Sequence, residues 1–427
     1  MRNILQIALA LGILLSLAGC ASPGGQVAAQ SVQSDVERVA APDVPEADLA
    51  ELVKGNAAFA LELYHVLRKD HDNLFYSPYS ISVALAMTYA GADGETEQQM
   101  AGALHYTLAQ ERLHTAFNAL DQALAARGEG AKGKDAEGFR LHVANAIWGQ
   151  QDYTFLDAYL DVLALNYGAG LRLVDFVSAP EEARVTINDW VSDQTEGKIE
   201  DLIPAGAIDA LTRLVLTNAI YFNAAWSMPF EEERTADGPF YLLDGGQVTV
   251  PMMGQVESLG HAAGQGYQAV ELPYDGHELS MVILVPEEGE FEAFEEALDV
   301  ERVESILQDL RYTQVALSMP KFEIESSFSL VDALSALGMP VAFSDKADFS
   351  GMTGNRELVI SKVVHKAFVS VDEAGTEAAA ATAVMMELTA APAEPVEVTV
   401  DRPFLFAIRD IETGTLLFVG RVVDPSG

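Results

Sequence analysis

Residues 372–395 read DEAGTEAAAATAVMMELTAAPAEP, an alanine-rich stretch between two segments of strand-like composition. Residues 362–371 (KVVHKAFVSV) precede it and residues 396–408 (VEVTVDRPFLFAI) follow it, and both are rich in β-branched and aromatic residues. Alanine, glutamate, methionine and leucine favour a helix, but the stretch opens on Gly375 and closes on two prolines. Intrinsic propensity therefore does not decide the conformation of this stretch, which has to be inferred from the rest of the chain.

The composition of the chain limits its class and its partners. The sequence has 427 residues, 49% hydrophobic and 21% charged, which is typical of a globular protein long enough to bury a large core. It carries 64 acidic and 25 basic residues, a formal charge of -39. This excess of negative charge argues against nucleic acid, heparin-like polyanions and anionic membrane surfaces as partners.

The N-terminus has the features of an export signal. Arg2 precedes the apolar residues 4–17, a run too short to span a membrane comfortably, and the sequence then reads Leu-Ala-Gly-Cys. This ending resembles the lipobox of bacterial lipoproteins, and Cys20 is the only cysteine of the chain. We therefore predict a lipoprotein signal peptide over residues 1–19 and acylation of Cys20. An ordinary signal peptide with an incidental cysteine is the alternative.

Such a protein would be exported and held in the cell envelope by its lipid, at the outer membrane or the cell surface. Residues 20–51 are rich in small, polar and acidic residues without apolar periodicity, and this composition predicts a flexible tether after the lipidated cysteine.

One folded domain of mixed α and β structure is expected over residues 52–427. Apolar residues recur at helical spacing early in the chain, in residues 51–69 and in a second helix over residues 81–100. Strand-like runs predominate later, among them residues 313–324. Helices followed by strands are typical of an α+β fold.

The sequence contains no motif that builds an enzyme active site. The glycine pattern of residues 128–133 follows a helical segment and precedes a strand, the reverse of a dinucleotide-binding loop. There is no G-x-S-x-G motif, and the eight histidines are not spaced as metal ligands. We therefore expect no catalytic residues, no metal and no cofactor. His365 lies among apolar residues, where a hydrogen-bonded core histidine is the ordinary interpretation.

Seven stretches, in this order, resemble the serpin family over nearly all of residues 52–425. They are NLFYSPYSISVALAMTYAGADGETEQQM (73–100), INDWVSDQTEGKIEDLI (187–203), LVLTNAIYFNAAW (214–226), TVPMMGQ (249–255), SMPKFEIE (318–325), SKVVHKAFVSVDEAGTEAAAAT (361–382) and DRPFLFAIRDIETGTLLFVGRVVDP (401–425).

The resemblance implies a serpin fold with three β-sheets, eight or nine helices and an exposed reactive centre loop at about residues 373–395. It also implies a monomer that inhibits serine proteases as a suicide substrate. A protease cleaves the loop, the loop inserts into the main sheet, and the covalent acyl-enzyme is carried with it. The alternative is a non-inhibitory cell-surface serpin that acts as a binding protein.

The loop has the pattern that insertion as a strand requires. From Thr376 onward, one parity of residues carries no charge, whereas the other carries Glu377 and Glu387 and can face solvent. Gly375 supplies backbone freedom where the chain folds over, and residues 375–382 contain no proline or bulky side chain. These residues match the hinge of inhibitory serpins, which here comprises Glu373, Gly375, Thr376, Glu377, Ala378, Ala379 and Ala380.

The usual inhibitory spacing from Gly375 places the reactive bond between Thr389 and Ala390, with the bonds one and three residues earlier as alternatives. A small residue before the cut suits the shallow pocket of an elastase-like or subtilisin-like serine protease. The loop contains no Lys or Arg, so trypsin-like targets are not expected, whereas papain-like cysteine proteases stay open.

The resemblance also assigns residues that keep the main sheet closed before insertion. Ser77, Ser80, Asn218 and His365 match the hydrogen-bonded cluster at its centre, and Trp226 matches the tryptophan near its top, where the loop first enters. Basic residues are too sparse for a glycosaminoglycan site, so heparin should not be needed.

Overall fold

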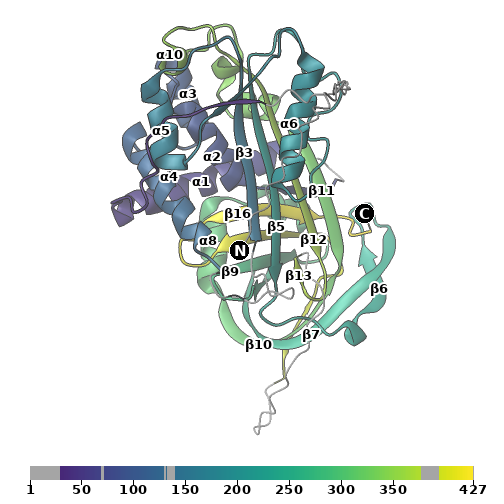
Figure 1. Cartoon of the computed structure of the whole chain (residues 1–427). Helices are drawn as coiled ribbons and strands as arrows, with labels where there is room; N and C mark the ends of the chain where they lie inside the picture. Colours follow the sequence, from purple (N-terminus) through teal and green to yellow (C-terminus); the bar gives the residue numbers. More distant parts are fainter. Residues whose placement is uncertain (1–28, 69–71, 129–130, 132–139, 377–393, 427) are drawn as a thin grey trace, which may run out of the picture.

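The computed structural model describes residues 29–68, 72–128, 131, 140–376 and 394–426 (Figure 1). The helices are α1 (Glu46–Leu67), α2 (Pro78–Tyr89), α3 (Gly94–Ala103), α4 (Gln110–Ala125), α5 (Asp157–Tyr167), α6 (Pro180–Gln194), α7 (Phe291–Glu296), α8 (Val300–Asp309), α9 (Val331–Ala336) and α10 (Ser350–Thr353), with 3-10 turns η1 (Glu232–Arg234) and η2 (Pro340–Phe343).

The strands are β1 (Gln30–Val32), β2 (Leu74–Tyr76), β3 (Arg140–Gln150), β4 (Leu171–Val174), β5 (Leu214–Ala225), β6 (Ala236–Tyr241), β7 (Gln247–Gly264), β8 (Tyr267–Pro273), β9 (Leu279–Pro286), β10 (Arg311–Pro320), β11 (Phe322–Ser329), β12 (Ile360–Val371), β13 (Gly375–Thr376), β14 (Val396–Thr399), β15 (Phe404–Asp410) and β16 (Leu416–Val422).

Seven strands form the main sheet, in the order β1-β4-β3-β5-β13-β12-β11. Its central strands β5 and β12 run parallel and pair directly from Leu214 to Tyr221, and β13 lies between them only at one end (Figure 1). The strand β5 is apolar on both faces because both are covered, as its sequence predicts.

The other strands form one continuous sheet of nine, so two hydrogen-bonded sheets replace the three that we expected. The long strand β7 causes this difference, because it pairs with β6 near Gln247 and with β8 near Gly264 and so joins two sheets into one. The described residues also contain ten α-helices rather than eight or nine, several of them as short as α10. The predicted α+β class is nevertheless confirmed.

Two predicted elements are each divided in the structure. The helix expected over residues 81–100 is broken between α2 and α3, where Asp93 caps the second helix. The strand expected over residues 313–324 is two strands, β10 and β11, which belong to different sheets. Both breaks carry a turn signal in the sequence, Gly91 and Gly94 in the first and Pro320 in the second, and the expected elements ran through these signals.

A large core fills the space between the two sheets and beneath α1 and α2. A smaller core lies on the opposite face of the main sheet, where Ile187 and Val191 of α6 pack against Val215 and Ala219 of β5. This second core extends to Val364 of β12, so the α6 layer covers the seam between the two central strands (Figure 1).

The N-terminal segment is packed on the domain, and the predicted flexible tether to residue 51 is therefore wrong for residues 29–51. Strand β1 pairs antiparallel with β4 at the edge of the main sheet. The amide of Val39 donates to the carbonyl of Leu165 at 3.0 Å, and α1 already begins at Glu46. A short polar segment can join a sheet edge through backbone groups alone, and its composition does not reveal this pairing.

The predicted signal peptide and Cys20 lie outside the described residues. Among the helices of the described part of the chain, none combines the length and apolarity that crossing a bilayer requires.

The packing of the N-terminal segment can be tested at Arg38, whose Nε donates to Asn118 Oδ1 at 2.8 Å and whose Nη2 pairs with Asp121 at 2.7 Å. We expect Arg38→Ala to lower the free energy of unfolding by about 1 kcal/mol, because these bonds are lost. Urea unfolding measures this change. The exposed neighbour Glu37→Ala is the control, and equal stability of both variants would contradict the docking of this segment.

Candidate functional site

The hinge is seated in the main sheet at Gly375 and Thr376. Gly375 pairs with Ala225 and Thr376 pairs with Ala224 of β5, and Thr376 also pairs with Val371 of β12 (Figure 1). Thr376, the first member of the uncharged parity, is completely buried. A Cβ at position 375 would lie 2.2 Å from the carbonyl oxygen of Ala224. Glycine is thus required there by close approach of the β5 backbone.

Glu373 anchors the start of the hinge. Its Oε2 pairs with Lys321 Nζ at 2.7 Å, and its Oε1 accepts a hydrogen bond from Thr235 Oγ1 at 2.7 Å. Burial by itself would raise the pKa of Glu373, but the hydrogen bonds from Lys321 and Thr235 outweigh it and lower the pKa. The carboxylate therefore stays ionised and ties the hinge to the β11 side of the sheet.

Trp226 lies where the loop enters the sheet, as predicted. Its amide donates to the carbonyl of Ala374 at 2.9 Å, and its Nε1 donates to the carbonyl of Asp372 at 3.0 Å. The indole stacks on Tyr274 with centroids 4.6 Å apart, and the Tyr274 hydroxyl is hydrogen bonded to Thr376 Oγ1 at 2.8 Å. The tryptophan therefore holds the backbone before the hinge, and its stacking partner holds the hinge itself.

A polar cluster closes the centre of the main sheet and joins α2, β3, β5 and β12. His365 of β12 is hydrogen bonded through Nδ1 to Asn218 Oδ1 of β5. Asn218 Nδ2 donates to Ser80 Oγ at 2.5 Å and to Asn145 Oδ1 of β3. Ser77 caps α2, and its amide donates to His365 Nε2 at 3.3 Å. The four residues that the resemblance assigns to this cluster are thus brought together.

The proton of His365 can be placed from its partners. Because the Ser77 amide donates to Nε2, that nitrogen is the acceptor, and Nδ1 carries the proton and donates to Asn218. Complete burial lowers the pKa of His365 to about 3. The imidazole is therefore neutral at physiological pH and acts as a structural link, in agreement with its interpretation as a core histidine.

Four contacting residues were not predicted from the sequence: Asn145, Thr235, Tyr274 and Lys321. Asn145 could have been predicted as a buried polar residue, because it is an amide inside the apolar run VANAIWG. The other three lie far from the hinge in the chain, and no local pattern distinguishes them from surface or core residues.

The remaining predicted hinge residues and the reactive bond lie outside the described residues: Glu377, Ala378, Ala379, Ala380, Thr389 and Ala390. Within the described part of the chain, no group of three or more histidine, cysteine, aspartate or glutamate side chains is placed to hold a metal ion.

The fold, the hinge contacts and the polar cluster are those expected of a serpin. Comparisons with known proteins show the family. The profile of the serpin family, described as serine protease inhibitor, matches residues 54–425, and the chain belongs to this family. Leukocyte elastase inhibitor A of Rattus norvegicus is 41% identical over 389 residues, covering 88% of this chain and all of the relative.

Two solved structures are also similar. The thermophilic serpin tengpin in its native state has a TM-score of 0.83 with 30% identity, over 93% of this chain and all of that one. Human thyroxine-binding globulin complexed with thyroxine has a TM-score of 0.79 with 29% identity, over 89% of this chain and all of that one.

We expect Asn218→Ala or His365→Ala to destabilise the native state by about 1 to 3 kcal/mol, because each leaves a buried polar partner unpaired at the centre of the sheet. Native gels after mild heating should show conversion to latent or polymeric forms. Asn166→Ala is a matched control, since its side chain bonds only the Val162 carbonyl within α5. A variant that stays monomeric and unconverted on heating would refute this role.

Stability should fall between pH 7 and pH 5 because two buried histidines resist protonation. Burial lowers the pKa of His365 to about 3 and that of His114 to about 4, from 6.5. Below pH 6.5 the unfolded chain takes up protons that the native state excludes, so each histidine lowers the free energy of unfolding by up to about 1.4 kcal/mol per pH unit. Urea unfolding at several pH values measures the slope. His114→Gln should be flatter, and a wild-type profile with no slope would contradict the burial effect.

Proposed function

We propose that the protein inhibits serine proteases as a suicide substrate whose cleaved loop inserts between β5 and β12. The observation that carries this proposal is the seat of the hinge, because Gly375 and Thr376 already occupy the position of the inserted strand. Antiparallel continuation of the pairing of Thr376 with Ala224 would place Met386 opposite Leu214, the first residue of β5. The uncharged parity of the loop would then face the large core.

Insertion requires the seam between β5 and β12 to open. The hydrogen bond from His365 to Asn218 crosses this seam, and eight residues of β12, from Ile360 to Phe368, pair directly with β5. A new strand would pair with both neighbours and replace this one ladder by two. The gain in backbone pairing and burial supports an irreversible step, and the closed seam supports a native state that waits for cleavage.

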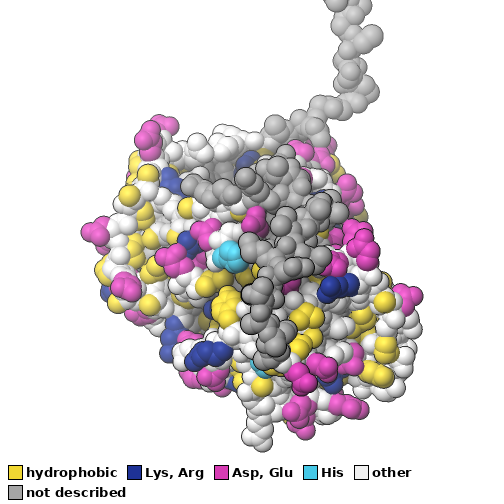
Figure 2. All heavy atoms as spheres, turned by 90° about the horizontal axis from the view of Figure 1, so that it is seen from below, with side chains coloured by type: hydrophobic (Ala, Val, Ile, Leu, Met, Phe, Trp, Pro, Cys, Tyr) yellow, Lys and Arg dark blue, Asp and Glu magenta, His cyan; other side chains and the backbone are white. Residues whose placement is uncertain are grey.

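The target class follows from the loop and from the relatives. A cut between Thr389 and Ala390 would suit elastase-like or subtilisin-like serine proteases, with papain-like cysteine proteases as a second class. The similarity to leukocyte elastase inhibitor A supports the elastase-like choice. We propose no heparin requirement, because on the face that Figure 2 shows the basic side chains are scattered among acidic ones.

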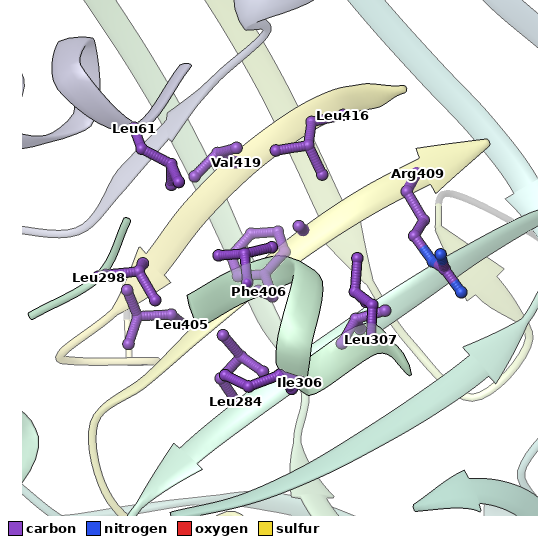
Figure 3. A pocket seen from close by; sticks show the side chains of 13 residues that line it. Leu61, Leu284, Leu298, Ile306, Leu307, Leu405, Phe406, Arg409, Leu416 and Val419 are labelled. Atoms are coloured by element: carbon purple, nitrogen blue, oxygen red, sulfur yellow. The ribbon is translucent and has the colours of Figure 1, made fainter. Parts of the chain in front are cut away.

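For the alternative, a non-inhibitory binding protein, the enclosed apolar cavity of the described structure offers no ligand site. An apolar cavity lies beneath α8 against β9, β15 and β16 (Figure 3). Its volume of about 30 Å³ is far below the roughly 300 to 1,000 Å³ of sites that enclose small organic ligands. Its lining is almost wholly apolar and includes Leu61, Leu284, Ile306, Leu307, Phe406 and Leu416.

We further propose that the protein is exported and anchored through a lipid on Cys20, where it would protect the cell envelope from proteases. The apolar run before a single cysteine supports this proposal. Metabolic labelling with palmitate should mark the wild-type chain and not Cys20→Ser, whereas equal labelling of both would exclude acylation at this residue.

A protease-trapping assay tests the proposed function. We expect a chain that begins at Ala21, and so retains every described residue, to form an SDS-resistant complex of summed mass with pancreatic elastase or subtilisin. Sequencing the released peptide locates the reactive bond. If each protease cleaves the loop and stays active, the protein is a substrate and not an inhibitor.

Ala378→Arg should convert the inhibitor into a substrate, because continued pairing in this register would bring its guanidinium into the large core, whereas Thr376 is already buried there in the native state. We expect cleavage with at least about tenfold less trapped complex on the gel, since a buried unpaired charge costs more than 1.4 kcal/mol. Glu377→Arg is the matched control, because its parity faces away from the core. Equal trapping by both variants would contradict insertion in this register.

A further inference from the structure

An open hollow of about 650 Å³ lies between the β7–β8 turn, α7 and α8, and none of its lining residues belongs to the hinge or to the main sheet. Its volume lies within the roughly 300 to 1,000 Å³ of sites that bind small organic molecules. The proposed protease inhibition makes no use of it. Its lining includes Tyr267 at the start of β8, Glu287 and Glu290 after β9, Phe294 of α7, and Arg302 and Ser305 of α8.

Hydrogen bonds hold the walls of the hollow in place. The amide of Glu287 donates to the carbonyl of Gly266 at 2.9 Å, which ties the segment after β9 to the β7–β8 turn. Asp299 caps α8, since its Oδ1 accepts from the amide of Arg302 at 2.8 Å. Arg302 and Ser305 are three residues apart in this helix, so their side chains lie on one face of it. The hollow is therefore formed before any ligand binds.

Two aromatic rings line the hollow. Phe294 is buried, and its ring centroid lies 5.3 Å from that of the partly exposed Tyr267. A Cβ at position 264 would lie 2.4 Å from the Tyr267 ring, so Gly264 allows this ring to lie against the β7 backbone. Aromatic rings attract one another at centroid distances of about 4.5 to 7 Å. Tyr267 is therefore placed to contact the ring of a ligand in the hollow.

Arg302 brings a positive charge to the hollow without an acidic partner. Its Cζ lies 4.4 Å from the centroid of Phe294, a cation–π contact that fixes the position of the guanidinium. No carboxylate in the described part of the chain forms an ion pair with Arg302, although the protein carries a formal charge of -39. The hydroxyls of Tyr267 and Ser305 likewise have no hydrogen-bond partner among the residues that the structure describes. One cation and two hydroxyl donors are thus available to bind a carboxylate.

Glu287 and Glu290 add negative charge to the same hollow. Both side chains are exposed, and neither forms an ion pair within the described residues. A ligand with only a carboxylate would be repelled by these glutamates, and a ligand with only an ammonium group would be repelled by Arg302. A ligand that carries both charges can pair with both kinds of group.

We propose that this hollow binds a free amino acid with an aromatic side chain. The carboxylate of the ligand would pair with Arg302, whose parallel N–H donors match its two oxygens. Its ammonium group would lie against Glu287 or Glu290, and its ring would pack on Tyr267. This binding activity does not depend on protease inhibition.

Isothermal titration calorimetry tests the ligand class with the chain that begins at Ala21, which retains every described residue. L-phenylalanine should bind saturably, with one molecule per chain. It should bind at least about fivefold more tightly than phenylacetate or phenethylamine, because each of these lacks one of its two charges. Equal affinity for the three probes, or no binding of any of them, would overturn the proposal.

A charge-removing variant locates the binding site. Arg302→Gln should weaken the binding of L-phenylalanine at least about tenfold, because the charge-assisted hydrogen bonds to its carboxylate are lost. Lys346→Gln is the control, since it removes one positive charge from an exposed position outside the hollow, and it should bind as the wild type does. Unchanged binding by Arg302→Gln, or an equal loss in both variants, would contradict a site in this hollow.

A reciprocal test does not depend on the stability of a variant. Glu287→Gln combined with Glu290→Gln should weaken the binding of L-phenylalanine but strengthen that of phenylacetate, because the repulsion of its lone carboxylate is removed. A change in the same direction for both probes would show that the glutamates do not bind the ammonium group. All of these variants should trap elastase as the wild type does, so a failure here is distinguishable from a failure of the proposed function.

Discussion

The structure depends on the closed seam between two parallel strands, β5 and β12. A hydrogen bond from His365 of β12 to Asn218 of β5 bridges this seam. Every feature of the site acts on this seam. The polar cluster closes its centre, the α6 layer covers it from outside, and the hinge opens it at one end, where Thr376 is already paired on both sides. Under the proposed function, this native state keeps room for one more strand until the loop is cut.

The two ends of β5 have different roles in the proposed mechanism. At one end, Glu373, Trp226 and Tyr274 hold the loop base in place by bonds to Lys321, to the backbone and to Thr376. At the other end, β5 begins at Leu214, which would lie opposite Met386 of a strand in that register. Under the proposed function, the length of β5 sets how far the cleaved loop could pair, and the expected reactive bond lies three residues beyond that length.

Much of this could be read from the sequence, and the reasons are local. The apolar strand before Trp226, the uncharged parity after Gly375 and the helix start at Ser77 all leave signals within a few residues. Lys321 and Tyr274 could not be found, because their roles exist only through partners distant in the chain. The packing of residues 29–45 was missed for another reason. Strand pairing at a sheet edge uses backbone groups and does not require apolar side chains, so this packed segment has the composition of a flexible tether.

The most direct test is the distance between the two halves of the main sheet. Spin labels at Val143 of β3, which is 39% exposed, and at the partly exposed Lys366 of β12 report on it where β12 still pairs directly with β5. If a strand enters between β5 and β12, the separation should increase by about 5 Å, one strand spacing, when the elastase complex forms. An unchanged separation in a proven covalent complex would contradict insertion at this seam.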